Sequence, residues 1–291
     1  MSIAFQLLIN GIIAGGIYAL VASGFSLIYS TNKLVHFAHG GVIAFTAYVL
    51  YLLFNVLDLN FVFSVILAIL FASLLGYAIN ILVYKQLRKK RASSAIMLIA
   101  SIALLIFLES LILLIFKADI KTIGFINTTT GIELGGALIT PLQIIIIVSS
   151  LVLLGSLFFF MKKTMLGKAL RAVSDNKDVA EIIGISSEKI YSLSFIIGSA
   201  IAGTAAILIS LEQNLTPFMG TGLIIKGFAA AVIGGLGSVP GAILGAFLLG
   251  ITENFGIWYL PSGYKDAIAF VLLIIFLLFR PNGILGIKNR N

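Results

Sequence analysis

The sequence predicts an all-α fold: a polytopic helical membrane protein with eight or nine transmembrane segments in a single domain, residues 1–291. Three observations lead to this prediction. Of the 291 residues, 60% are hydrophobic and only 10% are charged. The mean hydropathy is +1.16, and a soluble domain of that composition would lack the polar surface that water requires. Apolar runs of roughly 20 residues, the length with which a helix crosses a lipid bilayer, recur along the chain.

The start of the chain, MSIAFQLLIN, has no basic stretch and no small-residue cleavage site. We therefore expect it to begin the first membrane helix rather than a removable signal peptide. The absence of cysteine excludes disulfides, thiol catalysis and cysteine-based metal sites. The net charge of +8 would suggest nucleic acid in a soluble protein, but basic cytoplasmic loops explain it better in a membrane protein. No nucleic-acid partner is expected.

The apolar runs also predict the order of the membrane segments and their orientation. Most of the 19 Lys and Arg residues lie outside these runs, at Lys33, in 85–91, in 162–189 and in 280–290. Nine crossings with the N-terminus outside place all four regions, and the C-terminus, on the cytoplasmic side, as the positive-inside rule requires. The expected segments are approximately 4–30, 37–56, 61–84, 94–116, 141–161, 190–211, 218–236, 239–257 and 266–280.

The segment at 218–236 is the exception, because its apolar core is short and Lys226 interrupts it. It could be re-entrant, since irregular segments at membrane depth are tolerated inside protein. Eight crossings would then place Arg280 and Lys288 outside, so nine are favoured. The longest outside loop, about 117–140, is too short and too rich in Thr and Gly to form a domain.

Glycine is abundant, with 29 residues, and most are expected to let helices approach closely, as at Gly11, Gly15 and Gly245. A second cluster is dense enough to break a helix, and broken helices within the membrane line cavities or protein interfaces. It comprises Gly234, Gly235, Gly237, Ser238, Pro240 and Gly241.

Enzymatic chemistry is not indicated, and no catalytic residue is assigned. The chain lacks HExxH, a phosphate-binding GxxxxGK[ST] and paired membrane aspartates. Its only histidines, His36 and His39, have few acidic neighbours with which to hold a metal ion. Glu109 and Glu212 are expected at helix ends or in interhelical hydrogen bonds. For Glu253, that interpretation and a functional role are about equally favoured.

The loop at 162–189 is long for a connection between membrane helices. It predicts a short amphipathic helix with Val179, Ile182 and Ile183 on an inward apolar side, capped by Asp175 or Asn176 and ended by Gly184. Such a helix is typical of a docking element for a partner protein. The alternative is a helix lying on lipid headgroups.

Three stretches carry a resemblance to a known family. They are NGIIAGGIYALVASGFSLIYSTNKLVHFAHGG (10–41), RAVSDNKDVAEIIGISSEKI (171–190) and AAVIGGLGSVPGAILGAFLLGITE (230–253). In this order they resemble elements of the branched-chain amino acid ABC transporter permeases of the LivH type. The chain departs from that pattern at His36, where the family has Asn, and in a coupling loop that reads DVAEIIG rather than E-A-A-G.

The resemblance implies the membrane part of a bacterial ABC importer in the plasma (inner) membrane, for branched-chain or related amino acids. Its implied partners are a second permease subunit (a paralogue or another copy), two ATP-binding cassette subunits and an extracytoplasmic substrate-binding protein. ATP would be bound by the partners, so no cofactor is expected here. Contact with the ATPase is implied for Asp178, Ala180, Glu181, Ile183, Gly184 and Ile185.

Residues expected on the translocation path or at its gate are His39, Gly40, Gly234, Gly235, Gly237, Ser238 and Glu253. Both histidines are expected at the cytoplasmic end of the second segment, where His39 would act in structure or gating. Two alternatives remain open: a permease of the same family for an amide or urea, and a self-sufficient channel or secondary carrier. The latter would move solute in liposomes without partners.

Overall fold

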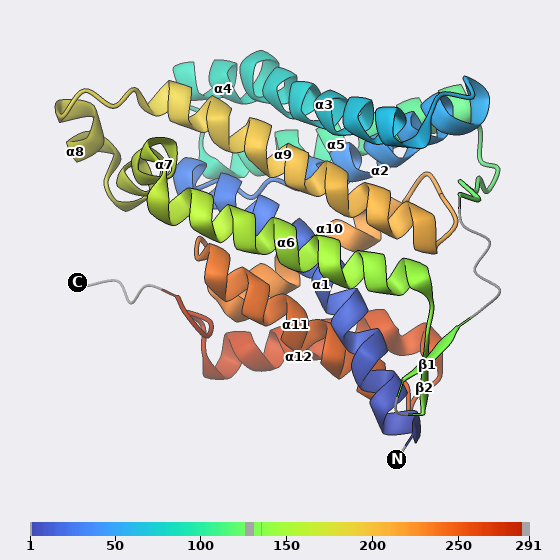
Figure 1. Ribbon diagram of the computed structural model, residues 1–291. Coiled ribbons are helices and arrows are strands. Elements are labelled where there is room, and N and C mark those ends of the chain that lie inside the picture. Colours follow the sequence, from blue (N-terminus) through green and yellow to red (C-terminus); the bar gives the residue numbers. More distant parts are fainter. Residues whose placement is uncertain (1, 126–130, 135, 287–291) are drawn as a thin grey trace.

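The structure, a computed structural model, describes residues 2–125, 131–134 and 136–286 as a bundle of long helices (Figure 1). Eight helices in these ranges are long and apolar enough to cross a membrane, and α10 is shorter. The predicted polytopic α-helical fold is confirmed. The helices of the bundle are α1 (Ser2–Asn32), α2 (Ala38–Tyr51) with a π-helical turn η1 (Leu52–Val56), α3 (Phe61–Ile79) with η2 (Asn80–Tyr84) and α4 (Lys85–Lys89), α5 (Ser94–Phe116), α6 (Pro141–Lys163), α9 (Ser187–Glu212), α10 (Met219–Gly234), α11 (Val239–Gly256) and α12 (Lys265–Phe279).

The remaining elements mark the two ends of the bundle (Figure 1). The antiparallel strands β1 (Ile132–Leu134) and β2 (Ala137–Ile139) lie at the end where α1 begins, which we call the hairpin end. The short helices α7 (Met165–Asp175) and α8 (Lys177–Ile182) lie with α4 at the opposite end, which we call the basic end. A 3₁₀ turn, η3 (Ser262–Tyr264), precedes α12.

The two basic loops, 85–91 and 162–189, therefore share one end, as the charge pattern predicts. The described chain also finishes at that end, where Gly286 lies against Gly235. Since α1 starts at the hairpin end, the chain passes through the bundle an odd number of times. Nine passes fit this arrangement and eight do not.

Helix α10 is one of the nine passes and not a re-entrant segment. Just before it, the backbone of Leu215 pairs with Lys121 in the loop at the hairpin end. Just after it, Gly237 lies beside Ser30 near the basic end of α1. Its 16 residues span about 24 Å at 1.5 Å per residue, and most of its side chains are buried.

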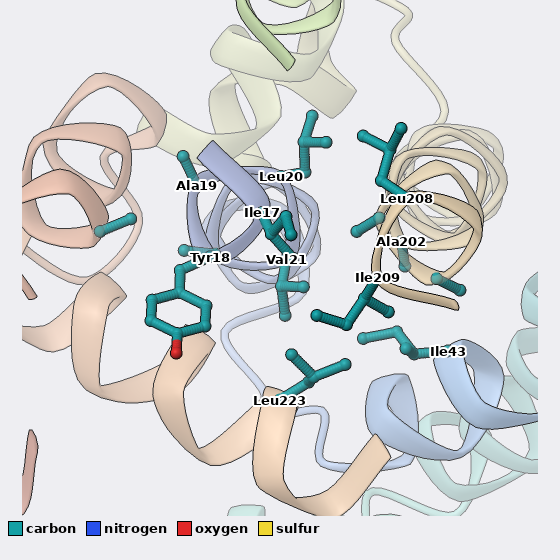
Figure 2. Close-up of a cluster of buried hydrophobic side chains, with 14 of the residues drawn as sticks. Ile17, Tyr18, Ala19, Leu20, Val21, Ile43, Ala202, Leu208, Ile209 and Leu223 are labelled. Atoms are coloured by element: carbon teal, nitrogen blue, oxygen red, sulfur yellow. The ribbon is translucent and has the colours of Figure 1, made fainter. Parts of the chain in front are cut away.

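The core forms around α1, which packs most extensively against α11. Small residues make this contact close: an added Cβ on Gly11 would lie 2.8 Å from the Ile251 Cα. The helix-packing role predicted for Gly11, Gly15 and Gly245 is confirmed, since all three face backbone or side chains of a neighbouring helix. Figure 2 shows the apolar centre, where side chains from α1, α2, α9 and α10 converge.

The outer helices α3, α5, α6 and α12 expose large apolar side chains along their length. Leu74, Leu114, Phe159 and Leu278 are each more than half exposed. In a soluble protein such a surface would be covered, whereas in lipid it is the favourable surface. The exposed apolar girdle therefore agrees with membrane insertion.

Candidate coupling loop and transport path

The coupling loop contains the predicted helix, α8, and a second one, α7, that the sequence analysis missed. Asn176 caps α8 by accepting a hydrogen bond from the Val179 N–H at 3.1 Å. Gly184 ends it in the left-handed conformation, with φ +88°. Both predicted boundary signals are therefore confirmed. The periodicity of α7, with Leu170 and Val173 buried on one face, was available in the sequence.

The apolar side of α8 points outward, so the predicted inward orientation is wrong. Ile182 is 83% exposed and Ile183 is 67% exposed, whereas Ala180 is buried against the cluster that contains Leu27 and Leu170. Helix α8 has only six residues, and the side that contains Ala180 is the one that packs on the bundle, so the side with Ile182 stays exposed. The structure therefore presents branched apolar side chains at the tip of the basic end, where α8 projects from the bundle (Figure 1).

The other residues predicted for ATPase contact differ in how exposed they are to solvent. Asp178 and Glu181 are exposed, and Glu181 pairs with Lys177 at 3.9 Å, one turn away. Gly184 is exposed, and Ile185 is half-buried against the same cluster as Ala180. Asp178, Glu181, Ile183 and Gly184 are thus available to a partner.

A charged joint lies directly behind this loop. The Arg88 guanidinium makes two hydrogen bonds of 3.0 Å to Glu188, in the first turn of α9. It also donates to Asn80 at 2.9 Å and lies 4.8 Å from the ring centre of Tyr191. Asn32, the last residue of α1, accepts a longer bond at 3.4 Å. The joint connects α1, η2–α4 and α9, and its members lie far apart in the sequence, so no local pattern indicates it.

The glycine-rich break is a tight turn between two antiparallel helices, α10 and α11. Gly234 packs backbone to backbone on Gly241, and Gly235, at φ +115°, lies against Gly286. These contacts leave no open space at Gly234 or Gly235. Gly237 and Ser238 instead line a cavity of about 420 Å³ at the basic end, with Ser30, Arg171 and Asp175 among its other lining residues. A path or gate role for the four positions stays a prediction.

His36 precedes α2 and His39 lies in its first turn, at the basic end of the second segment as predicted, but the chain between α1 and α2 folds back so that this end lies inside the bundle. An added Cβ on Gly24 would lie 3.0 Å from the His39 Nε2. Gly24 precedes the end of α1 by eight residues, about 12 Å. His36 and His39 are both fully buried, and Gly40 packs against the Gly220 carbonyl of α10. Helix α2 thus begins inside the protein.

Each imidazole has different surroundings. His36 Nδ1 lies 2.9 Å from the Tyr84 hydroxyl, and its ring packs edge-on against Phe195. Neither ring nitrogen of His39 has a hydrogen-bond partner among the described residues. Both histidines therefore belong to the packed interior of the bundle, and the gating role of His39 stays a prediction.

Tyr84→Phe is expected to lower the free energy of unfolding by about 1–3 kcal/mol, because it leaves the buried His36 Nδ1 without its partner. Thermal unfolding of the purified protein in detergent measures this loss. Tyr77→Phe on the lipid-facing side of the same helix is the control, since Tyr77 is 39% exposed. Equal loss in both variants would contradict the pairing.

Two of the three membrane acids occupy positions that agree with the structural interpretation. Glu109 on α5 accepts a hydrogen bond of 2.5 Å from the Thr221 hydroxyl on α10. Glu212 ends α9 and lines a small polar cavity with Asn10 and Gln143. The interhelical and helix-end positions expected for these acids are both confirmed.

Glu253 belongs to a cluster of three charged residues and one tyrosine that the sequence analysis did not assemble. Tyr18 donates to Glu253 Oε2 at 2.9 Å, and Lys226 Nζ lies 3.4 Å from the same oxygen. Lys226 also lies 3.0 Å from Asp266 Oδ1. One residue each comes from α1, α10, α11 and α12. Lys226, which interrupts the apolar run at 218–236, is therefore stabilised by two carboxylates.

These observations define a class. The chain is a polytopic helical membrane subunit with an exposed apolar helix at the tip of one end, and its sequence carries no nucleotide-binding motif. The sequence signature of the family described as "Branched-chain amino acid transport system / permease component" matches residues 7–277. The chain belongs to this family of transport permeases.

Individual relatives match over almost the whole length. The chain is 37% identical to the high-affinity branched-chain amino acid transport system permease protein BraD of Pseudomonas aeruginosa, covering 97% of this chain and 95% of that one. LivH of Escherichia coli is 32% identical over the same shares, and a probable LivH of Methanocaldococcus jannaschii is 30% identical. PsaBC from Streptococcus pneumoniae in complex with Fab contains a chain of similar fold, with a TM-score of 0.51 and 16% identity over 94% and 91% of the two chains.

Proposed function

We propose that this chain is the membrane-spanning subunit of an ABC importer that moves branched-chain or chemically similar amino acids inward. Family membership supports the transport role, and the names of the relatives support the substrate class. ATP hydrolysis belongs to separate cassette subunits, because the chain has no nucleotide-binding motif. A second permease subunit and an extracytoplasmic binding protein complete the importer, and the chain itself is not an enzyme.

The observation that carries the proposal is the outward apolar side of α8. Val179, Ile182 and Ile183 are 53%, 83% and 67% exposed at the tip of the basic end, beyond the membrane helices. A self-sufficient carrier has no need of such a projection, whereas an ATPase groove would cover it. The positive-inside rule supports a cytoplasmic basic end and an external N-terminus, and the apolar helices together with the permease relatives support a position in the plasma membrane.

Ile182→Asp is expected to abolish copurification of the cassette subunits while leaving the chain folded in the membrane. The side chain is 83% exposed, so the folded chain tolerates a carboxylate there, but an apolar groove does not. The measurement is recovery of the ATPases from detergent extract through a tag on this chain. Leu138→Asp, 61% exposed at the hairpin end, is the control. Normal recovery with Ile182→Asp would contradict the docking assignment, and unaided solute flux in liposomes would favour a carrier.

A further inference from the structure

Two adjoining cavities open at the hairpin end, where α9 ends and α10 and α12 begin. Their volumes are about 610 and 230 Å³. Both are lined by Tyr18, Ile209, Gln213 and Lys265, so they form one hollow with two lobes, which we call the outer hollow. It lies at the end opposite α8, on the side from which an extracytoplasmic binding protein would deliver substrate.

The lining of the outer hollow combines both signs of charge with apolar surface. Lys226 and Asp266 lie in the larger lobe, Glu212 lies in the smaller lobe, and Lys265 is shared. Two cations and two anions therefore line one space. Apolar walls come from Ile17 on α1, Ile209 on α9 and Leu223 on α10, all three of which are labelled in Figure 2.

We propose that the outer hollow binds the amino acid as a zwitterion before it crosses the membrane. Lys226 and Lys265 bind the α-carboxylate, Glu212 binds the α-ammonium group, and Ile209 and Leu223 cover the aliphatic side chain. Balanced charges and a part-apolar wall suit a small zwitterion better than a net ion or a neutral amide. This inference rests on the proposed function and adds a location and a binding mode.

Lys226 is held in a way that allows exchange of partners. Its inner partner, Glu253, is only 1% exposed and also bonded to Tyr18, whereas its outer partner, Asp266, is 71% exposed. An exposed ion pair contributes little, so the carboxylate of an incoming ligand can replace Asp266 while Glu253 keeps Lys226 in place. Removing Lys226 and removing Asp266 should therefore have opposite effects on ligand binding.

Thiol protection in the complete transporter tests the site, because the chain has no cysteine of its own. Asn214→Cys places a thiol in the lining of the larger lobe. In nanodiscs without binding protein or ATP, leucine is expected to slow its modification by a charged maleimide. Isovalerate and isopentylamine, which each lack one of the two charges, should slow it far less. Thr122→Cys, exposed in the hairpin-end loop outside the lining, is the control whose modification stays unchanged.

Charge variants then identify the carboxylate partners. Lys226→Gln is expected to raise the leucine concentration for half-protection at least about 10-fold, since a charge-assisted bond is lost. Asp266→Asn is expected to leave that concentration unchanged or lower it. Lys265→Gln should act in the same direction as Lys226→Gln. It also tests the site if Lys226→Gln fails to fold because the buried Glu253 carboxylate has lost its cationic partner.

Three results would overturn the site: no protection by leucine, equal protection by either single-charge analogue, or equal weakening by Asp266→Asn and the lysine variants. Recovery of the cassette subunits through α8 is measured on the same preparations. Normal recovery with no protection rejects the outer hollow alone. Loss of recovery in the unmodified chain rejects the proposed function itself.

Discussion

Gly250→Leu is expected to prevent the chain from reaching its folded state. A Cβ at this position would lie 2.5 Å from the Gly15 backbone nitrogen and 2.7 Å from the Gly11 carbonyl oxygen. Both obstructing atoms are backbone of α1, so no side chain can rotate away to make room. The cost should exceed the roughly 1–3 kcal/mol typical of overpacked cores. Because α1–α11 is the most extensive helix contact in the described chain, the whole bundle depends on it.

Size-exclusion chromatography of a fluorescent fusion, extracted in mild detergent, measures this effect as loss of the monodisperse peak. Gly155→Leu is the matched control, because an added Cβ at Gly155 on α6 meets nothing within 4 Å. It adds the same side chain to a membrane helix on an exposed face. Monodisperse peaks of equal height for both variants would show that the α1–α11 contact is not close in the native protein.

Arg88→Leu is expected to leave the chain folded but to reduce the stimulation of ATP hydrolysis by substrate-loaded binding protein about 5-fold or more, the lower end of typical coupling energies. Arg88 joins Glu188 in the first turn of α9 to Asn80 before α4 and to Asn32 at the end of α1. The α8 tip leads through Gly184 and Ser186 directly into that turn of α9. Without the joint, movement of α8 is no longer tied to α1 and α4.

Reconstituted transporter supplies the measurement, as ATPase turnover with and without loaded binding protein. Lys89→Leu is the control, since Lys89 is the exposed basic neighbour of Arg88. Glu188→Gln should reduce stimulation in the same direction, and the double variant Arg88→Leu/Glu188→Gln should lose less than the sum of the two effects. Full stimulation in Arg88→Leu, or additive losses in the double variant, would contradict coupling through this joint.

The coupling loop shows how far local sequence signals extend. Asn176 and Gly184 mark the ends of α8 through hydrogen bonding and backbone conformation that depend on one residue each, so the sequence predicts both. The direction of Ile182 and Ile183 is not such a local property. It depends on which side of α8 the rest of the bundle covers, and the bundle covers only Ala180.

Composition and charge pattern alone favoured nine passes and grouped the basic loops at one end, and three sequence motifs indicated the family. The apolar length of each segment and the positive charge of its flanking loops are local properties that determine how that segment inserts in the bilayer. They can therefore be recognised from the sequence alone. Tertiary structure decided the depth of His36 and His39, because a five-residue return into the bundle has no sequence period. It also decided the assembly of Tyr18, Lys226, Glu253 and Asp266 from four helices, since only packing brings charges from distant segments within hydrogen-bonding distance of one another.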